Sequence, residues 1–272
     1  MSTPRIVFIG AGHMASSLIG GMVKQGMDAQ FIGACDHNPP KLQALHEQYQ
    51  IHTYLDSLTA LANADVVVLA VKPQVMQTLC EQLKEEGDIQ DKLFISLAAG
   101  ITCAHLKKWL GDVAVIRAMP NLPAKVGLGL TALFANPQAN DEHKQIATQT
   151  LQSVGEVIWV ENEQGINHII AAAGSAPAYF FLFMDAMSQY AQQLGFSAEQ
   201  ARAIVTQTAL GSATLAAQEM DTSLGQMCAN VAVKGGTTAE AVNVFENAGL
   251  RDTVKQAMQA AIDRSKQLED QL

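Results

Sequence analysis

Short apolar runs alternate with amphipathic stretches through the first 160 positions of the chain. The runs predicted to form strands are 5–9, 31–36, 64–71, 93–97, 113–118 and 157–160. Their apolar residues are continuous rather than alternating, as in strands of a parallel sheet that is covered on both faces. Between two of these strands, Asn38 is expected to cap a helix that Pro39 opens. The alternation predicts an α/β fold with an open, doubly wound sheet.

The character of the sequence changes at the polar connector 161–165. Beyond it the chain is rich in Ala, Met and Gln, and its apolar residues recur with helical periodicity. Ser197 and Gln200 have the spacing of a capping box, which marks the start of a helix. We therefore expect an α/β domain at 1–161 and an all-helical domain at 162–272.

Residues 165–184 contain no Asp, Glu, Lys or Arg, and a membrane-spanning helix needs about 20 such residues. Asn167, Gly174 and Pro177 fall inside this stretch, so we expect buried helices rather than a membrane span. A large apolar surface on a protein in water usually marks an interface. The helical domain is therefore expected to form a homodimer.

Composition and charge narrow the class of protein. Of the 272 residues, 49 % are apolar and 16 % are charged, which is typical of a globular chain. The 17 Lys and Arg residues against 26 Asp and Glu residues give a net charge of −9. This balance argues against a broad nucleic-acid footprint and against attraction to an anionic membrane surface. We expect a protein that acts on a small molecule, with neither nucleic acid nor a membrane as partner.

The cysteines are scattered at Cys35, Cys80, Cys103 and Cys228, without a C-x-x-C pair or a His at metal-ligand spacing. Buried reduced thiols are therefore expected, with no disulfide framework and no metal site. The N-terminal sequence lacks the apolar stretch and cleavage site of a signal peptide. These features favour the cytoplasm as the location.

A glycine-rich turn follows the first predicted strand directly. Residues 10–15, Gly-Ala-Gly-His-Met-Ala, match the pattern G-x-G-x-x-A and open the first predicted helix. Gly10 permits the tight turn, Gly12 lets the backbone approach a diphosphate, and Ala15 allows close packing of helix and sheet. The first N–H groups of the helix then favour an anion. The motif predicts dinucleotide binding, with His13 as a polar contact over the turn.

Asp36 lies at the end of the second predicted strand, 21 positions after Ala15. A carboxylate there accepts hydrogen bonds from the adenosine ribose, which favours NAD, and it repels a 2′-phosphate. His37 and Asn38 follow Asp36, and they can bond a phosphate if Asp36 points away. The residues leave the choice between NADH and NADPH open.

The segment 70–74, Ala-Val-Lys-Pro-Gln, ends the third major strand. Ligands of doubly wound sheets bind beyond the carboxyl ends of the strands, so this loop is expected beside the cofactor. Pro73 suits the first turn of the next helix. Lys72 is either a solvated surface residue or a group that approaches the nicotinamide ribose or the phosphates.

Taken together, six segments resemble the pyrroline-5-carboxylate reductase family along nearly the whole chain. They are GAGHMA (10–15), AVKPQ (70–74), ISLAAGI (95–101), RAMPNLPAKVGLG (117–129), GSAPAY (174–179) and KGGTT (234–238). The resemblance implies an N-terminal Rossmann-type doubly wound sheet followed by an all-α C-terminal dimerisation domain. It also implies reduction of 1-pyrroline-5-carboxylate to L-proline with NADPH or NADH, the last step of proline biosynthesis. Members form homodimers and often larger assemblies, commonly decamers.

The resemblance also assigns residues to each site. The cofactor-binding residues that it and the dinucleotide motif imply are Gly10, Gly12, His13, Met14, Asp36, His37, Asn38, Asp56, Ala70, Val71, Lys72, Pro73, Ala98, Ala99, Gly100, Met119 and Asn121. The substrate-binding residues implied are Ser175, Lys234, Gly235, Gly236 and Thr237, and the side chain nearest the ring nitrogen is that of Thr238. A capping role for Ser175 is the alternative.

The Gly-Gly-Thr-Thr segment also indicates an anion site on physical grounds. A helix that begins there offers unshielded N–H groups and the positive end of its dipole to a carboxylate. The alternative is an ordinary helix start with a Thr cap. Thr238 can orient or relay a proton, but a hydroxyl whose pKa lies far from neutral is a poor general acid. Most of the catalysis is therefore expected to come from positioning of the cofactor and the imine.

The sequence departs from the family at three places. Val233 and Lys234 stand where the family usually has Ser-Pro. The binding of the substrate carboxylate is therefore expected to be altered, with Lys234 adding positive charge. Ala176 replaces the usual Gly. Asp56 stands where Asn or Ser is common near the adenosine ribose. With Asp36 it makes a second carboxylate where a 2′-phosphate would bind, which favours NADH.

Two other classes remain as alternatives. β-Hydroxyacid dehydrogenases share the domain order but place a catalytic Lys after the domain junction, and this sequence has no Lys between Lys144 and Lys234. A dinucleotide-binding sensor or scaffold without turnover is supported only by the altered residues Val233 and Lys234. An assay for consumption of the reduced cofactor with pyrroline-5-carboxylate distinguishes these three classes of protein.

Overall fold

The computed structural model describes residues 3–271 and divides the chain into two compact units. The first unit is Met1–Ser175 together with Ala261–Leu272, and the second is Ala176–Ala260. The first unit thus extends beyond the boundary expected at residue 161 and includes the end of the chain. It does so because Ile166 is buried against Met119 and Ala132 of the sheet.

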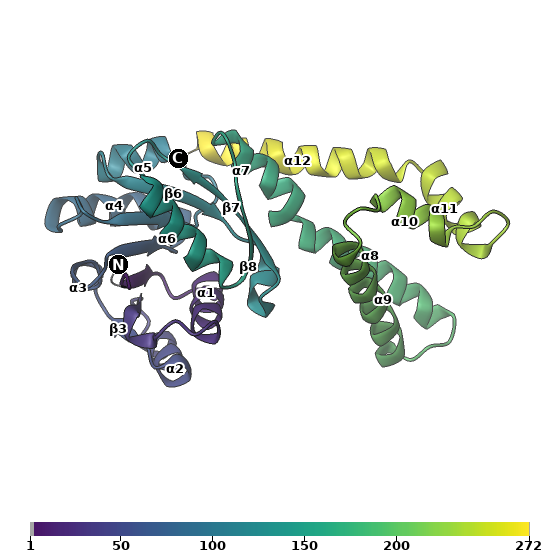
Figure 1. Cartoon of the computed structure of the whole chain (residues 1–272), viewed down its shortest axis with the longest axis horizontal. Helices are drawn as coiled ribbons and strands as arrows, with labels where there is room; N and C mark the ends of the chain where they lie inside the picture. Colours follow the sequence, from purple (N-terminus) through teal and green to yellow (C-terminus); the bar gives the residue numbers. More distant parts are fainter. Residues whose placement is uncertain (1–2, 272) are drawn as a thin grey trace. The chain divides into compact units, whose positions relative to one another are not determined.

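The first unit contains one sheet of eight strands (Figure 1). Its strands are β1 (Ile6–Ile9), β2 (Ile32–Cys35), β3 (His52–Tyr54), β4 (Val66–Leu69), β5 (Leu93–Ser96), β6 (Ala114–Met119), β7 (Gly129–Ala135) and β8 (Gly155–Trp159). Their order is β3-β2-β1-β4-β5-β6-β7-β8. The first six strands follow the classical dinucleotide-binding order, in which the direction of winding reverses between β1 and β4. The expected doubly wound sheet is confirmed.

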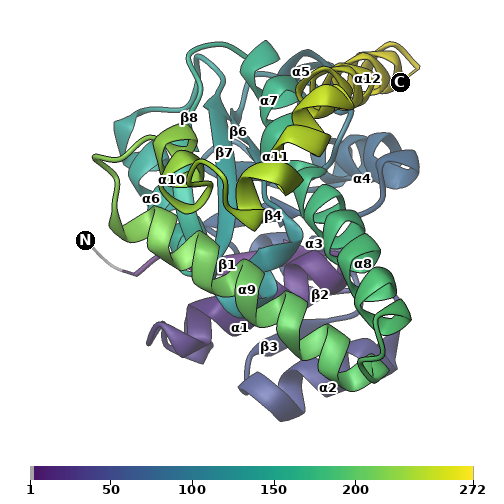
Figure 2. The same cartoon turned by 90° about the vertical axis from the view of Figure 1, so that its right-hand side faces the viewer.

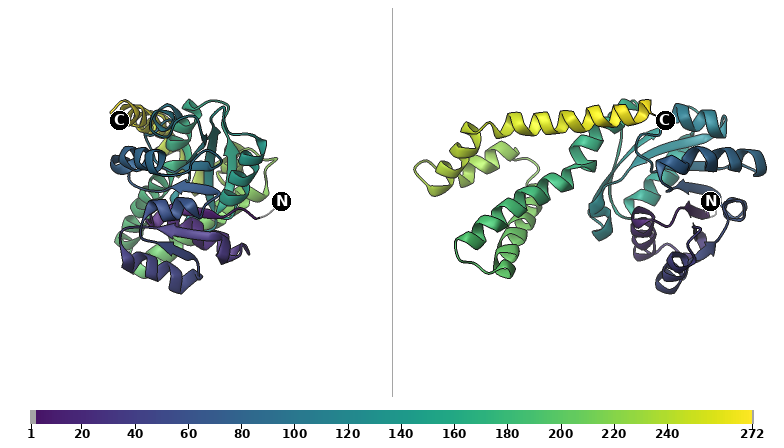
Figure 3. Two further views of the ribbon diagram at one scale, coloured as in Figure 1. Left: turned by 90° about the vertical axis from the view of Figure 1, so that its left-hand side faces the viewer. Right: turned by 180° about the vertical axis from the view of Figure 1, so that it is seen from behind.

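Helices cover both faces of this sheet (Figure 3). Helices α1, α2 and α6 share one buried apolar cluster with side chains such as Phe8, and α3, α4 and α5 share the other with side chains such as Val67. The α-helices of the unit are α1 (His13–Lys24), α2 (Pro39–Tyr49), α3 (Ser57–Ala62), α4 (Pro73–Glu86), α5 (Cys103–Leu110), α6 (Asp141–Gln152) and α7 (Gln164–Ile169). Short 3-10 helices lie at η1 (Ala29–Phe31) and η2 (Leu122–Val126). The two layers leave the carboxyl ends of the strands free for ligands.

Two strands were not expected from the sequence. The three residues of β3 lie at the edge of the sheet and are mostly exposed, so they lack the apolar run of a covered strand. Strand β7 pairs with β6 in the antiparallel sense, whereas the other pairs are parallel. Only η2 separates β6 from β7, and a parallel crossover needs a dozen residues or more. The short connection therefore dictates the reversed direction.

Two helix starts confirm what the sequence predicted. The side chain of Asn38 accepts a hydrogen bond from the Lys41 N–H at 3.3 Å and caps α2. The Ser197 Oγ accepts from the Gln200 N–H at 3.1 Å, and the Gln200 side chain accepts from the Ser197 N–H at 2.9 Å. This reciprocal pair is the capping box expected at the start of α9 (Ala198–Gln218).

The second unit has almost no core of its own. Besides α9 it contains α8 (Ala176–Gln193), α10 (Leu224–Val231), α11 (Thr237–Asn247) and the first half of α12 (Leu250–Asp270). Helices α8 and α9 pack side by side, and both can be seen in Figure 2. None of the described residues of α8, α10 and α11 is buried, and Phe180 and Leu182 are 69 % and 72 % exposed. Helices with this much open apolar surface need another surface to cover them.

One helical segment has the length and composition of a membrane span. Helix α7, the π-helical turn η3 (Ile170–Gly174) and α8 form a continuous apolar stretch over Gln164–Gln193, of which little is buried. Length and composition are the sole basis for that match, and the core helix of a water-soluble assembly passes the same test. The surface of α8 is thus equally suited to pack against protein.

The Asn136 side chain follows β7 and forms hydrogen bonds with the backbone at the start of β6. Its side-chain N–H donates to the Val113 carbonyl at 2.8 Å, and its Oδ1 accepts from the N–H groups of Val115 at 3.0 Å and Ala139 at 3.1 Å. The residue is 8 % exposed, so water has little access to these groups. The Val113 carbonyl and the Val115 N–H would lose this partner if the amide were removed, whereas the Ala139 N–H also donates to the Asn136 backbone carbonyl at 3.1 Å.

We expect Asn136→Ala to lower the free energy of unfolding by about 2–3 kcal/mol, because it leaves buried backbone groups unsatisfied. Denaturant unfolding of the full chain measures the change. Gln138→Ala is the control, since the exposed Gln138 side chain bonds only the exposed Asp112, and its effect is expected within about 0.5 kcal/mol. Equal stability of the two variants would contradict the role of Asn136.

Candidate functional site

A cavity of about 820 Å³ opens at the carboxyl ends of β1 and β4, where the winding of the sheet reverses. This is the place at which open α/β sheets bind their ligands. The expected residues that line the cavity are Gly10, Gly12, Asp36, His37, Asp56, Ala70, Val71 and Lys72. The structure thus brings together the residues that follow β1, β2 and β4, although they are far apart in the sequence.

The glycine-rich turn has the shape that a diphosphate requires. Gly10 has a φ of +106°, and a Cβ at that position would lie 2.6 Å from the Ala70 carbonyl oxygen. Only glycine therefore fits between β1 and the end of β4. A Cβ at Gly12 would meet nothing within 4 Å, so the backbone is open on that side. Helix α1 begins at the next residue without a side-chain cap, and its first N–H groups are available to an anion. These residues fit a dinucleotide.

Asp36 ties the second strand to this turn. Its side chain is 7 % exposed, and its carboxylate accepts the Ala11 N–H at 2.9 Å and the Asn38 N–H at 3.0 Å. The Lys41 Nζ and the His37 Nδ1 each lie 3.7 Å from one of the two oxygens. Each oxygen keeps a lone pair, so the carboxylate orders the glycine-rich turn and still has acceptor capacity toward the cavity.

Asp56 has a second role that the sequence did not reveal. Its Oδ1 accepts the Thr59 N–H at 2.8 Å and caps the start of α3. Hydrogen bonds from Thr59 hold the pKa of the Asp56 carboxyl below its usual value, so it is charged near neutral pH. Two carboxylates, those of Asp36 and Asp56, and two ammonium groups, those of Lys41 and Lys72, therefore line the cavity, and the Lys41 Nζ lies 3.7 Å from Asp36.

Several lining residues were missed from the sequence. Lys41 follows the two prolines that open α2, and Leu55 and Ser57 flank Asp56. The others are on α4, at Gln74, Val75, Thr78, Leu79 and Gln82. Their spacing of three and four residues places them on one helical face, and this spacing is the signal that was available in the sequence. Lys41 carried no such signal, because its contact with Asp36 depends on the packing of α2.

Some expected cofactor residues lie outside the lining of this cavity. Those residues are His13, Met14, Asn38, Pro73, Ala98, Ala99, Gly100, Met119 and Asn121. His13 borders a different hollow, and Met14 packs against the core. The Asn121 side chain accepts the Leu130 N–H at 2.9 Å and donates to the Ala173 carbonyl at 3.2 Å. Asn121 thus fixes neighbouring backbone, including the π-helical turn η3.

Ser175 lies directly after that π-helical turn. Its N–H donates to the Ile170 carbonyl at 2.7 Å, which closes the wider turn. Such turns within α-helices are frequent at functional sites. The observed bond is made by the Ser175 backbone.

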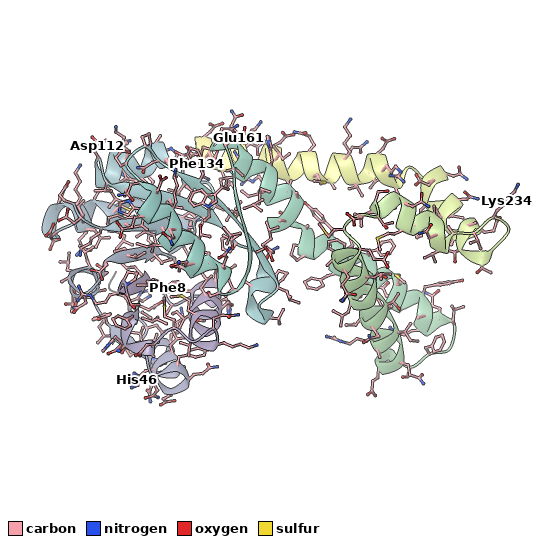
Figure 4. The ribbon with its side chains drawn as sticks, in the orientation of Figure 1. Phe8, His46, Asp112, Phe134, Glu161 and Lys234 are labelled. Carbon is pink, nitrogen blue, oxygen red and sulfur yellow. The ribbon has the colours of Figure 1, made fainter. Side chains whose placement is uncertain are left out.

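The Gly-Gly-Thr-Thr segment begins a helix, as expected. Gly235 has a φ of +78°, Gly236 is the N-cap residue of α11, and no side chain caps this end. Thr237 and Thr238 are the first two helical residues, so their N–H groups lack partners within the helix. Lys234 is exposed in the connection between α10 and α11 (Figure 4). This end of α11 offers N–H groups, a hydroxyl and a nearby cation to an anion.

The four cysteines are free thiols. Burial raises the pKa of Cys35 to about 11, and that of Cys80 and Cys103 to about 12, so these three are protonated at neutral pH. Within residues 3–271, no group of three His, Cys, Asp or Glu side chains is placed to hold a metal ion.

Two family models match the chain. Residues 5–100 match the model described as NADP oxidoreductase, coenzyme F420-dependent, which covers the cavity and the glycine-rich turn. Residues 163–268 match the model described as pyrroline-5-carboxylate reductase dimerisation. The uncovered apolar helices of the second unit are thus dimerisation helices, and the chain forms a homo-oligomer.

Individual proteins match the chain along its whole length. The pyrroline-5-carboxylate reductase of Vibrio alginolyticus is 44 % identical over 270 residues, with 99 % of each chain covered. The solved structure of the Coxiella burnetii reductase is 40 % identical, with a TM-score of 0.93 and coverage of 98 % of this chain and 99 % of that chain. A Plasmodium falciparum reductase solved with NADP bound has the same fold at 24 % identity, with a TM-score of 0.88 and 99 % of each chain covered. Since residues 5–100 match the NADP oxidoreductase model, a nicotinamide dinucleotide is the cofactor class. On this sequence identity and fold, the chain belongs to the pyrroline-5-carboxylate reductase family.

Proposed function

We propose that this enzyme reduces 1-pyrroline-5-carboxylate to L-proline by hydride transfer from NAD(P)H, the last step of proline biosynthesis. The observation that carries the proposal is 44 % identity over 99 % of the chain to a named reductase. Two features of the structure support it: an open cavity at the switch point of the sheet and an uncapped helix start at Gly236. The first suits a dinucleotide and the second suits a carboxylate.

The bound cofactor supplies the hydride that the imine carbon accepts. For this step, the N–H groups at the start of α1 hold the diphosphate, and Gly12 leaves room for its close approach. Val71 and Lys72 form the wall on the nicotinamide side, and Asp36 keeps the glycine-rich turn in shape through Ala11. Ala98, Ala99 and Gly100, with Met119 and Asn121, complete the surroundings of the nicotinamide.

On the substrate side, the N–H groups of Thr237 and Thr238 receive the substrate carboxylate, because the Gly236 N–H already donates to the Val233 carbonyl at 3.0 Å. The positive end of the α11 dipole favours that charge, and Lys234 adds a nearby cation. The Thr238 hydroxyl orients the proton on the ring nitrogen, which carries it in the product. Because a hydroxyl is a weak acid, alignment of imine and cofactor contributes most of the rate.

Cofactor preference, assembly and location complete the proposal. NADH is favoured, because the Asp36 carboxylate follows β2 and the Asp56 carboxylate precedes α3, where the two negative charges repel a 2′-phosphate. The dimer is the assembly that the exposed apolar helices support, and a decamer built from five such dimers is the larger assembly proposed. The four free thiols favour the cytoplasm.

The proposed activity is tested by mixing the purified protein with pyrroline-5-carboxylate and either reduced cofactor. Loss of reduced-nicotinamide absorbance and formation of proline are expected, faster with NADH than with NADPH. Tight cofactor binding without consumption would instead identify a sensor or scaffold. Activity on a hydroxyacid with oxidised cofactor would identify a dehydrogenase of the other class.

Thr238→Ala is expected to lower kcat by about 10–100-fold, because a positioned proton donor contributes on that order. Dinucleotide affinity is expected to stay within about twofold, since the substituted side chain is outside the glycine-rich turn. Steady-state kinetics and calorimetric titration measure the two quantities. Thr214→Ala is the matched control, because that hydroxyl is exposed and bonds only the Leu210 carbonyl of its own helix. An equal loss of cofactor affinity in Thr238→Ala would contradict the assignment.

Asp36→Ser is expected to raise the ratio of kcat/KM for NADPH to that for NADH by about tenfold, equivalent to about 1.4 kcal/mol, because a negative charge is removed beside the 2′ position. Asp36→Asn is the companion variant, since its side-chain oxygen can still accept the Ala11 N–H. A similar ratio in both variants attributes the change to charge rather than to a loosened turn. An unchanged ratio in both would mean that Asp36 faces away from the ribose.

A further inference from the structure

The C-terminal end of α12 lies against the loop between β5 and α5, within the first unit (Figure 1). Gly100 in this loop has a φ of +78°, and a Cβ built on it would be 3.2 Å from the Leu268 Cβ. A residue larger than glycine would therefore press on Leu268. The last turn of α12 thus packs directly on the backbone of the loop that contains Ala98, Ala99 and Gly100.

A buried cluster of charges fixes that last turn. Arg117 of β6 is 2 % exposed, and its guanidinium donates to Glu163 at 2.7 Å and to Glu269 at 3.2 Å. The two carboxylates come from opposite ends of the second half of the chain, one before α7 and one at the end of α12. A buried guanidinium needs such partners, because an uncompensated charge in the interior is costly.

The same cluster of charges also contacts the other end of the loop between β5 and α5. The Glu163 Oε1 that contacts Arg117 also accepts the N–H of Cys103, the first residue of α5, at 2.6 Å. The other oxygen of Glu269 accepts the Asn167 side-chain N–H at 3.0 Å, and the Asn167 oxygen accepts the Ser265 hydroxyl at 2.7 Å. These bonds fix the position of α12 along its axis, so Leu268 has one place at which to meet Gly100.

We propose that Glu269 and Leu268 are positioning residues for hydride transfer, because they hold the Ala98–Gly100 loop in the shape that the nicotinamide needs. This inference rests on the proposed function, which puts that loop beside the nicotinamide. Glu269 acts through Arg117 and Asn167 by fixing the turn, and Leu268 acts by packing on Gly100. Neither residue touches the reacting atoms. Loss of either lets the loop move, and misplacement of about 1 Å in such a site costs up to about 100-fold in rate.

Glu269→Gln and Leu268→Ala test the proposal in the full-length enzyme. Glu269→Gln removes the charge that pairs with Arg117, and Leu268→Ala leaves the charge cluster intact while it opens space over Gly100. Asp270→Asn is the matched control, since it removes the same charge from the exposed neighbouring position. Leu268→Met keeps the side-chain volume, so it is expected to retain the packing on Gly100 that Leu268→Ala loses. The readouts are kcat, KM for both substrates, and hydrogen exchange of residues 97–103 without cofactor.

Both test variants are expected to lower kcat by about tenfold, with each KM within about twofold, and to speed exchange of residues 97–103. Asp270→Asn and Leu268→Met are expected to match the wild-type enzyme. Lower thermal stability with unchanged kcat and exchange would overturn the proposal, as would an equal effect in Asp270→Asn. If Glu269→Gln does not fold, the comparison of Leu268→Ala with Leu268→Met tests the proposal by itself. A wild-type enzyme without turnover would refute the proposed function instead, and exchange would still show whether α12 orders the loop.

Discussion

The ion pairs of the buried Arg117 guanidinium with Glu163 and Glu269 are the interactions on which the first unit depends. It joins β6 to the residue before α7 through Glu163 and to the last turn of α12 through Glu269. Removing one partner of a buried ion pair typically costs about 3–5 kcal/mol, since the remaining charge is left in a medium that solvates it poorly. The chain therefore closes on itself: its final residues belong to the same unit as its first strand. The loop that contains Gly100 takes its shape from this closure.

The second unit shows the opposite situation. Its helices are well formed, and α9 even has a complete capping box, but α8, α10 and α11 bury no described residue. Local hydrogen bonds and caps stabilise each helix by small amounts, and most helical stability in proteins comes from packing. The helices must therefore gain their core from another copy of the chain, as the match to a dimerisation model indicates.

The cofactor half of the site was largely predictable, since its signals are local. Gly10 and Gly12 are required by the backbone at the turn after β1, and Asp36 and Lys72 end or follow strands whose apolar runs were recognisable. Lys41 was missed because its contact with Asp36 depends on the packing of α2. The lining face of α4 was missed although its spacing of three and four residues is present in the sequence. The direction of strand β7 depends on the short connection from β6.

The sequence by itself determined six of the eight strands, the helix starts at Asn38 and Ser197 and the two amide-rich turns, because each depends on residues within a few positions of one another. Gly235 and the caps at Asn38 and Ser197 act within a single turn of chain, whereas Gly10 is required both by its own φ of +106° and by the Ala70 carbonyl, which a Cβ would meet at 2.6 Å. Tertiary structure alone decided the partners of Arg117, the second bond of Asp36 to Ala11, and the contact of Leu268 with Gly100. These pairs are far apart in the sequence, and only the burial of the sheet and of α12 brings their atoms within bonding distance.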